Sequence, residues 1–212
     1  MVEGSGNGRD VSPQAKRADG RVALVGILAL QGDFEAHAKI IEALGHQPRE
    51  VRVPADLEGL DGLIMPGGES TVMTLGIERE GLAEPIRELV GRGTPVLGTC
   101  AGLIMLDRNH LGVLDVVAAR NAFGRQLHSF EADLEIEGIE GGPVHAVFIR
   151  APWVAEHGAG VEVLARVDDH PVAIRQGNVV AISFHPELSG ETRLHELALA
   201  LQTPTGRPVR AT

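Results

Sequence analysis

The amino-acid sequence predicts an α/β fold with three layers. A flavodoxin-like, mostly parallel central sheet is flanked by helices, and extra antiparallel strands are expected in the second half. Two observations lead to this prediction. In the first half, continuous apolar runs alternate with stretches of helical periodicity, which is typical of strands buried on both faces of a parallel sheet. In the second half, short and partly alternating apolar stretches are separated by glycine-rich turns.

The first half of the chain predicts strands and helices in alternation. The run over 21–30 is apolar almost throughout, and a helical pattern follows it until Gly45, a suitable C-cap. Pro66 and the two glycines after it end a later strand. The expected elements are, in order, a strand over 21–30, a helix over 34–44, strands over 50–53 and 61–66, a helix from about 69–71, a helix over 82–91, a strand over 95–97 and a helix from 103.

The second half predicts mainly short strands. They are expected over 113–117, 133–136, 144–149, 161–167, 171–175 and 179–184, with a final helix over 192–201. Ligands of a parallel sheet bind at the carboxyl ends of its strands. The loops after Leu30, Pro66 and Leu97 should therefore lie along one edge of the sheet.

The composition is that of an ordinary globular protein. The 212 residues are 43% hydrophobic and 23% charged, which suffices for one domain with a sizeable core. A formal net charge of -10 argues against nucleic-acid and anionic membrane partners, because both favour basic surfaces. No apolar run reaches the roughly 20 residues that span a bilayer, so we expect a cytoplasmic protein.

The ends of the chain differ in composition from its centre. Residues 1–20 are rich in glycine and polar residues and lack the apolar segment of a secretory signal. We expect them to be a disordered extension or tag, followed by one folded domain over 21–203 and a flexible tail over 204–212.

The only cysteine lies where a nucleophile would be placed. Cys100 stands between a short apolar strand and a helix-forming run, with Gly98 and Gly102 on either side. This pattern is typical of a nucleophile elbow, in which a sharp turn lifts one side chain above the sheet. A thiol at a helix N-terminus has a lowered pKa and forms a thiolate more readily. The alternative is a buried structural cysteine, which is common.

A base and its orienting group are found together near the other end of the chain. His185 and Glu187 follow an apolar strand at positions i and i+2, so in extended geometry both side chains project to the same side. Pro186 between them is expected to suppress a helix there. A carboxylate can fix the tautomer of an imidazole through its second nitrogen. The alternative is a strand end with exposed polar residues.

Acyl transfer also needs donors for an oxyanion. The turn at Gly67 and Gly68 offers backbone amides that a substrate carbonyl can approach closely, and the amide of Ala101 follows the nucleophile directly. The alternative for the two glycines is a plain turn. The sequence has no dinucleotide or phosphate-binding fingerprint and no metal-ligand spacing, so we expect no cofactor and no metal.

Taken together, the motifs resemble a known family. The segment 98–102 with His185, Pro186 and Glu187 resembles the Cys-His-Glu triad of class I glutamine amidotransferases. Four further segments resemble the glutaminase subunits of pyridoxal 5′-phosphate synthase, and the likeness runs from about Val22 to Leu201. The four segments are Leu28-Ala29-Leu30-Gln31-Gly32, Pro66-Gly67-Gly68-Glu69-Ser70-Thr71, Arg120-Asn121-Ala122-Phe123-Gly124-Arg125-Gln126 and Phe148-Ile149-Arg150-Ala151-Pro152.

The resemblance implies an activity and a partner. Members of this family hydrolyse L-glutamine to glutamate and ammonia, and they pass the ammonia to a barrel-fold synthase subunit. The two subunits form a hetero-oligomer, and docking of the synthase subunit is required for activity. The resemblance implies Cys100 as the nucleophile that forms a γ-glutamyl thioester, His185 as the general base and acid, and Glu187 as its orienting group.

The remaining site positions also come from the resemblance. Gly68 and Ala101 match the oxyanion positions, with Gln31 in a supporting role. The positions that match glutamine binding are Gly68, Glu69, Ser70, Arg120, Ile149 and Arg150. An arginine can pair with the α-carboxylate of glutamine in fork geometry.

The chain departs from the family pattern in two places. The loop over 107–112 is shorter than usual, and residues 1–20 have no counterpart in the family.

Two other functions compete with the glutaminase that the resemblance implies. One alternative is another enzyme on the same elbow, such as the glutaminase of imidazole glycerol phosphate synthase or a relative of cysteine peptidases. Another is a binding or scaffolding subunit that has lost activity.

Overall fold

The fold is built on one seven-stranded sheet. The computed structural model describes residues 22–120 and 129–201. In spatial order the strands are β2 (Gln47–Val51), β1 (Leu24–Leu28), β3 (Gly62–Met65), β4 (Val96–Thr99), β11 (Val179–Ile182), β10 (His170–Gln176) and β9 (Glu162–Val167). The first five strands run parallel to one another, whereas β10 runs antiparallel to both of its neighbours, β11 and β9. The prediction of a mostly parallel sheet with antiparallel strands in the second half is therefore confirmed.

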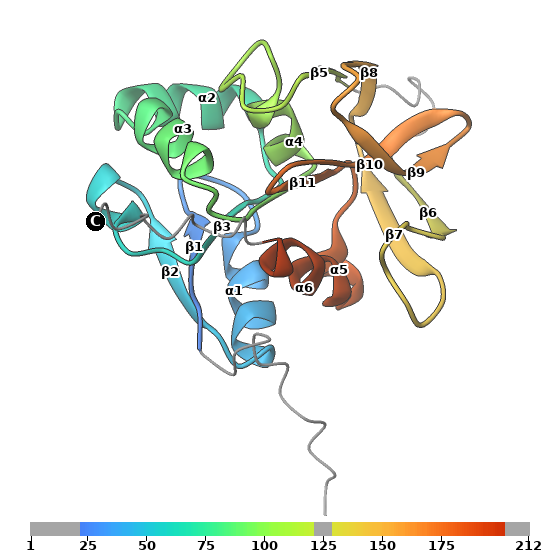
Figure 1. Cartoon of the computed structure of the whole chain (residues 1–212), viewed down its shortest axis with the longest axis horizontal. Helices are drawn as coiled ribbons and strands as arrows, with labels where there is room; N and C mark the ends of the chain where they lie inside the picture. The colour runs from blue at the N-terminus through green and yellow to red at the C-terminus, as the bar shows by residue number, and fades with distance from the viewer. Residues whose placement is uncertain (1–21, 121–128, 202–212) are drawn as a thin grey trace, which may run out of the picture.

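Helices cover both faces of this sheet. On one face lie α2 (Ser70–Arg79), α3 (Ala83–Gly91) and α4 (Ala101–Leu106), and on the other lie α1 (Phe34–Ala43), α5 (Pro186–Ser189) and α6 (Arg193–Ala200) (Figure 1). Strand β1 contributes to both cores, because Leu28 packs in the same cluster as Met73, whereas Ile27 packs in the same cluster as Ile41. Successive side chains of a strand point to opposite faces, so a strand covered on both sides needs a continuous apolar run.

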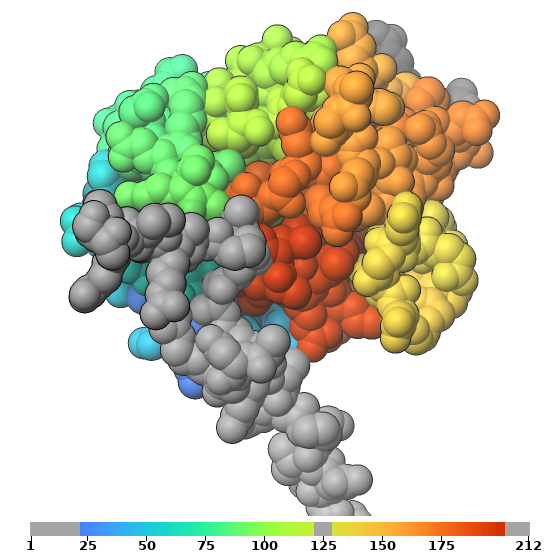
Figure 2. Space-filling model, viewed as in Figure 1, coloured from blue at the N-terminus to red at the C-terminus, as the bar shows by residue number. Residues whose placement is uncertain are grey.

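Two small antiparallel sheets complete the second half. Strands β6 (Ser129–Leu134) and β7 (Val144–Ile149) form a hairpin, and β5 (Val116–Ala119) pairs with β8 (Trp153–His157). A 3-10 helix (Pro54–Leu57) follows β2. In the space-filling view the hairpin forms a lobe (yellow) beside the segment that carries α5 and α6 (red) (Figure 2).

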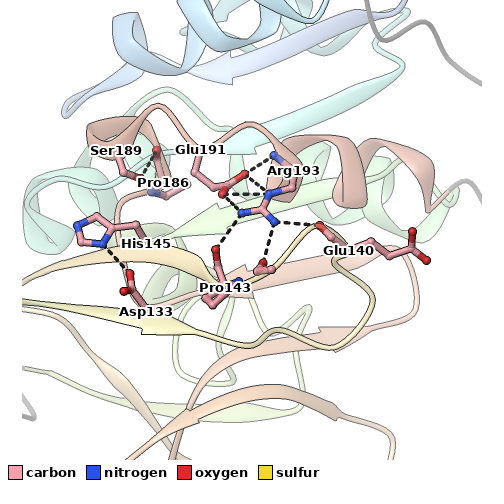
Figure 3. A network of polar contacts seen from close by, with 9 residues as sticks. Asp133, Glu140, Pro143, His145, Pro186, Ser189, Glu191 and Arg193 are labelled. Carbon is pink, nitrogen blue, oxygen red and sulfur yellow. Dashed lines mark hydrogen bonds and ion pairs between the residues drawn. The ribbon is translucent and has the colours of Figure 1, made fainter.

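One arginine fastens this hairpin to the domain. Arg193, at the start of α6, forms an ion pair with Glu191 and donates hydrogen bonds to the carbonyl oxygens of Glu140, Gly142 and Pro143 at 2.9–3.1 Å (Figure 3). These three carbonyls belong to the turn between β6 and β7. The turn is therefore held against the chain that follows His185. Strand β7 begins at this turn and ends at Ile149, which lines the cavity described below.

The edge strand β2 and three strands of the two small sheets were predicted least well. Strand β2 covers 47–51 rather than 50–53, β5 begins at 116 rather than 113, and β6 covers 129–134 rather than 133–136. Strand β8 was not predicted. Strand β2 is an edge strand, and β6 alternates exposed and partly buried residues, so neither needs an apolar run. The predicted extension 1–20 and tail 204–212 lie outside the described residues.

Candidate active site

Cys100 occupies a strained turn between β4 and α4. Its backbone has φ 48° and ψ −105°, a conformation that non-glycine residues rarely adopt, and its N–H donates to the carbonyl of Ile182 on β11 at 2.9 Å. Glycine at 102 is required here, because a Cβ would lie 2.0 Å from the carbonyl oxygen of Met65 on β3. The packing of α4 against the sheet thus holds the thiol above the carboxyl end of β4.

His185 and Glu187 lie next to this turn, at the end of the neighbouring strand. Nδ1 of His185 is 2.6 Å from Oε1 of Glu187, and the side chain of Glu187 is fully buried. The backbone N–H of His185 donates to the carbonyl of Val147 at 2.9 Å, which ties the imidazole segment to β7.

The backbone conformation that brings Glu187 to His185 differs from the predicted extended strand. Pro186 does not suppress a helix but is the first residue of α5, with His185 as its N-cap. Proline suits the first helical position because its missing N–H needs no partner there and its φ is already helical. The first helical turn, and not an extended strand, brings the carboxylate of Glu187 back to the imidazole.

Two effects on the pKa of His185 oppose each other. Burial lowers the pKa, whereas hydrogen bonds with Cys100 and Glu187 and the charges of both groups raise it, to about 10. The protonated imidazole is therefore stabilised at neutral pH beside the sulfur. Gly67 lets the ring approach, because a Cβ at this position would lie 2.4 Å from Cε1 of His185.

The turn after β3 faces the loop after β1. Gly68 has φ +153°, and the side-chain oxygen of Gln31 accepts a hydrogen bond from the backbone N–H of Glu69 at 2.6 Å. A Cβ on Gly68 would lie 2.3 Å from this oxygen. Across the site, the N–H of Ala101 is the first of α4, where a helix offers no internal acceptor. The predicted oxyanion positions thus border the same space.

A cavity of about 370 Å³ collects these groups. Every residue predicted for substrate binding or oxyanion stabilisation lines it, and Cys100 and His185 line it as well, while Glu187 lies behind the imidazole. Lining residues that sequence reasoning missed are Gly32, Asp33, Ile104 and Pro152. Asp33 follows the end of β1, so the rule that placed Gln31 at this edge could also have found Asp33.

The carboxylate of Glu69 caps the N-terminus of α2. Its two oxygens accept from the backbone N–H groups of Thr71 and Val72 at 3.1 and 3.0 Å, so the side chain is the N-cap of α2. These two hydrogen bonds lower its pKa, and the charge of Arg120 contributes a smaller lowering. A negative charge therefore stays at the cavity rim, which Arg120 lines as well.

The two predicted arginines reach the cavity from different elements. Arg120 follows β5, and its Nη2 lies 3.3 Å from Nε2 of His110. Arg150 follows β7 with a strained φ of 45°, and the carbonyl of Ile149 before it lies 3.9 Å from Sγ of Cys100. The remainder of the predicted segment, 121–126, lies outside the described residues.

The acidic groups near His185 bear on metal binding. Among the described residues, Asp33, His185 and Glu187 form the one group whose ligand atoms all lie within 4.8 Å of one another. His185 and Glu187 already satisfy each other at 2.6 Å, so a cation would have to compete with that hydrogen bond. None of the described helices has the length and apolar character needed to cross a membrane.

The chain matches a known family over most of its length. The model of the SNO glutamine amidotransferase family matches residues 27–201. The pyridoxal 5′-phosphate synthase subunit PdxT of Frankia alni is 51% identical over 191 residues, which cover 86% of this chain and 96% of the relative. The protein of the same name from Thermus thermophilus is 54% identical over 187 residues, which cover 84% and 97%.

Solved structures agree with these relatives. A crystal structure of a glutamine amidotransferase superposes with a TM-score of 0.79 at 49% identity, over 84% of this chain and 97% of the other. The structure of PurLQS from Thermotoga maritima superposes with a TM-score of 0.67 at 18% identity, over 85% and 98%. The latter shows a likeness of fold alone.

Proposed function

Because the chain belongs to the SNO glutamine amidotransferase family, we propose that it is the glutaminase subunit of a pyridoxal 5′-phosphate synthase. It hydrolyses L-glutamine to glutamate and ammonia for the biosynthesis of vitamin B6. The observation that carries this proposal is the arrangement around one cavity: a cysteine on a strained turn and an imidazole that a buried carboxylate holds at 2.6 Å.

The triad can perform both halves of the hydrolysis. With the proton of the Cys100–His185 pair on the imidazole, the thiolate attacks the amide carbon of the glutamine side chain. The N–H groups of Gly68 and Ala101 stabilise the oxyanion that forms. The C–N bond then breaks, the imidazolium gives its proton to the departing ammonia, and a γ-glutamyl thioester remains. His185 next takes a proton from water, which attacks the thioester, and the sulfur leaves to regenerate the enzyme.

The charged side chains of the cavity suit the α-carboxylate and α-ammonium groups of glutamine. Arg120 and Arg150 offer guanidinium groups for the α-carboxylate. The α-ammonium group is stabilised by the carboxylate of Glu69, which keeps unused lone pairs while it caps α2, and by carbonyl oxygens at the rim. Ser70 is buried at the start of α2 and completes this side of the pocket.

The relatives are named as subunits, which supports a partner. The proposed partner is a barrel-fold synthase subunit that receives the ammonia, and the chain hydrolyses glutamine poorly until the two associate. The loop over 31–33 borders the oxyanion positions, so a partner that touches this loop could alter their geometry without touching the triad.

The test uses glutamine labelled with ¹⁵N in its side-chain amide. Glutamate release is measured for the full chain alone and with the synthase subunit, and label in pyridoxal phosphate is measured when the two sugar phosphates are added. We expect faster hydrolysis in the complex and transfer of the label. Cys100→Ala is the matched control, and it should abolish both. Hydrolysis that survives in this variant contradicts the mechanism, and a wild-type complex inert toward glutamine contradicts the function.

A further inference from the structure

Two histidines are buried directly behind the triad. His37 on α1 and His195 on α6 are 0% and 1% exposed, and neither takes part in the mechanism above. Nδ1 of His37 lies 2.8 Å from Nε2 of His195. Burying two polar rings costs free energy unless hydrogen bonds compensate for it, so the position of their ring nitrogens is informative.

The other nitrogen of His37 faces the triad carboxylate. Its Nε2 lies 3.4 Å from Oε2 of Glu187 and 3.3 Å from Oγ1 of Thr99, the residue before Cys100. Both side chains of the His37–Glu187 pair are fully buried. The contact is long and falls outside hydrogen-bond geometry as the ring now stands, and Oε2 has no hydrogen-bond partner among the described residues. Oε1 is already bound to His185, so His37 faces the one carboxylate oxygen that the triad leaves open.

The positions of the protons follow from these partners. Burial, followed by the charges of His195 and His185, holds the pKa of His37 well below its usual value, so the ring is neutral. A carboxylate only accepts and the hydroxyl of Thr99 can accept too, so we place the proton of His37 on Nε2, where it suits both neighbours, and Nδ1 then accepts from Nε2–H of His195. Burial lowers the pKa of His195 to about 4. The backbone and charge of Glu191 oppose part of this lowering, while Nδ1 of His195 has no partner in good hydrogen-bond geometry among the described residues.

We propose that His37 is a positioning residue of the active site, whose Nε2–H holds the second oxygen of Glu187 and so fixes the carboxylate that orients His185. His195 in turn fixes the ring of His37. The groups that face His37 come from four elements: Glu187 from α5, His195 from α6, Thr99 from β4 and His185 from the end of β11. The proposal rests on the proposed function for the substrate, but the state of the thiol can be measured without any substrate.

The test uses two amide variants of the full chain that differ only in reach. In His37→Gln the amide nitrogen can occupy the place of Nε2 and donate to Glu187. In His37→Asn the amide reaches only the place of Nδ1 and keeps the contact with His195. Both introduce the same polar group, so the comparison separates the hydrogen bond to Glu187 from general effects of polarity. Thermal unfolding of both variants provides the control for folding.

The readout is the rate at which iodoacetamide alkylates the thiol as a function of pH. Cys100 is the only cysteine of the chain, so the reaction reports on that sulfur alone. A well-placed Glu187 stabilises the imidazolium, and the imidazolium stabilises the thiolate that reacts. We expect His37→Asn to move the rise in rate upward by about one pH unit, and His37→Gln to follow the wild type.

Equal profiles for all three chains, or an equal displacement of both variants, overturn the proposal. If His37→Asn does not fold, His37→Gln still decides: a wild-type profile supports the role of the donor, and a displaced profile contradicts it. Glutamine hydrolysis by the complex is measured in parallel. A displaced alkylation profile with no hydrolysis by the wild type would count against the proposed function and not against His37.

Discussion

His110 links Arg120 to a buried carboxylate. Nδ1 of His110 is 2.8 Å from Oδ1 of Asp107, which is 1% exposed, and Nε2 is 3.3 Å from Nη2 of Arg120. The second oxygen of Asp107 accepts from the backbone N–H of Ala118 at 3.1 Å. The short loop over 107–112 thus supports the arginine proposed to bind the α-carboxylate of glutamine.

The first prediction concerns this support. In His110→Asn the amide keeps the position next to Asp107 and loses the contact with Arg120. We expect KM for glutamine in the complex to rise about three- to fivefold, which corresponds to the loss of about one hydrogen bond, while kcat changes less than about twofold. Steady-state kinetics check this. A fall in kcat at constant KM would show that His110 serves the chemical step instead.

The second prediction concerns the approach of His185 to Gly67. In Gly67→Ala the new methyl group meets Cε1 of the imidazole at 2.4 Å, so the ring must move. We expect kcat to fall by about a hundredfold or more and stability by about 1–3 kcal/mol. Gly91→Ala is the control, since no atom lies within 4 Å of its Cβ and helix α3 gains helix propensity. Similar losses in the two variants would exclude a specific effect on His185.

The third prediction concerns pH. The pKa of His185 is raised from 6.5 to about 10 in the folded chain, so the folded state binds this proton more tightly than the unfolded state. The stabilisation is therefore complete below about pH 6.5 and is lost as the pH rises toward about 10. Urea unfolding at about pH 6, 8 and 9.5 measures it as the difference between wild type and His185→Asn. We expect this difference to shrink with rising pH by on the order of 1–3 kcal/mol, and growth with pH would contradict the raised pKa.

The fourth prediction concerns the arginine that fastens the hairpin. Arg193→Met keeps the aliphatic stem and removes hydrogen bonds to Glu191 and to three carbonyls of the turn. We expect a loss of about 1–3 kcal/mol in the free energy of unfolding. Arg79→Met is the control, because the ion pair of Arg79 with Glu80 is exposed and should contribute less than about 0.5 kcal/mol. Equal effects would mean that the contacts to the turn contribute nothing.

Sequence reasoning succeeded where one physical requirement dominates. Strands buried on both faces must be apolar throughout, so β1, β3, β4 and β11 are visible as runs. The turn at Cys100 is visible because a tight strand-to-helix connection needs small neighbours, and Gly102 lies against the carbonyl of Met65. The order of the strands in a parallel sheet then predicts which loops share an edge.

Sequence reasoning failed where a residue has more than one use. Glu69 was expected only as a glutamine-binding position, but its side chain caps a helix. His37 and His195 have no metal spacing in the sequence, and nothing local indicates that His37 of α1 and His195 of α6 meet behind Glu187. Such contacts depend on tertiary packing, which local periodicity does not contain.

The place of β11 in the sheet affects how the chain acquires its activity during synthesis. Strand β11 lies between β4 and β10, and it is made long after the cysteine segment that it pairs with. Until it leaves the ribosome, the nascent chain holds a cysteine but neither the imidazole nor the carboxylate, and the backbone of Cys100 has no Ile182 carbonyl to bind. The sheet is complete and the triad can assemble only after this late strand has been made. An unfinished chain therefore cannot hydrolyse glutamine through this triad.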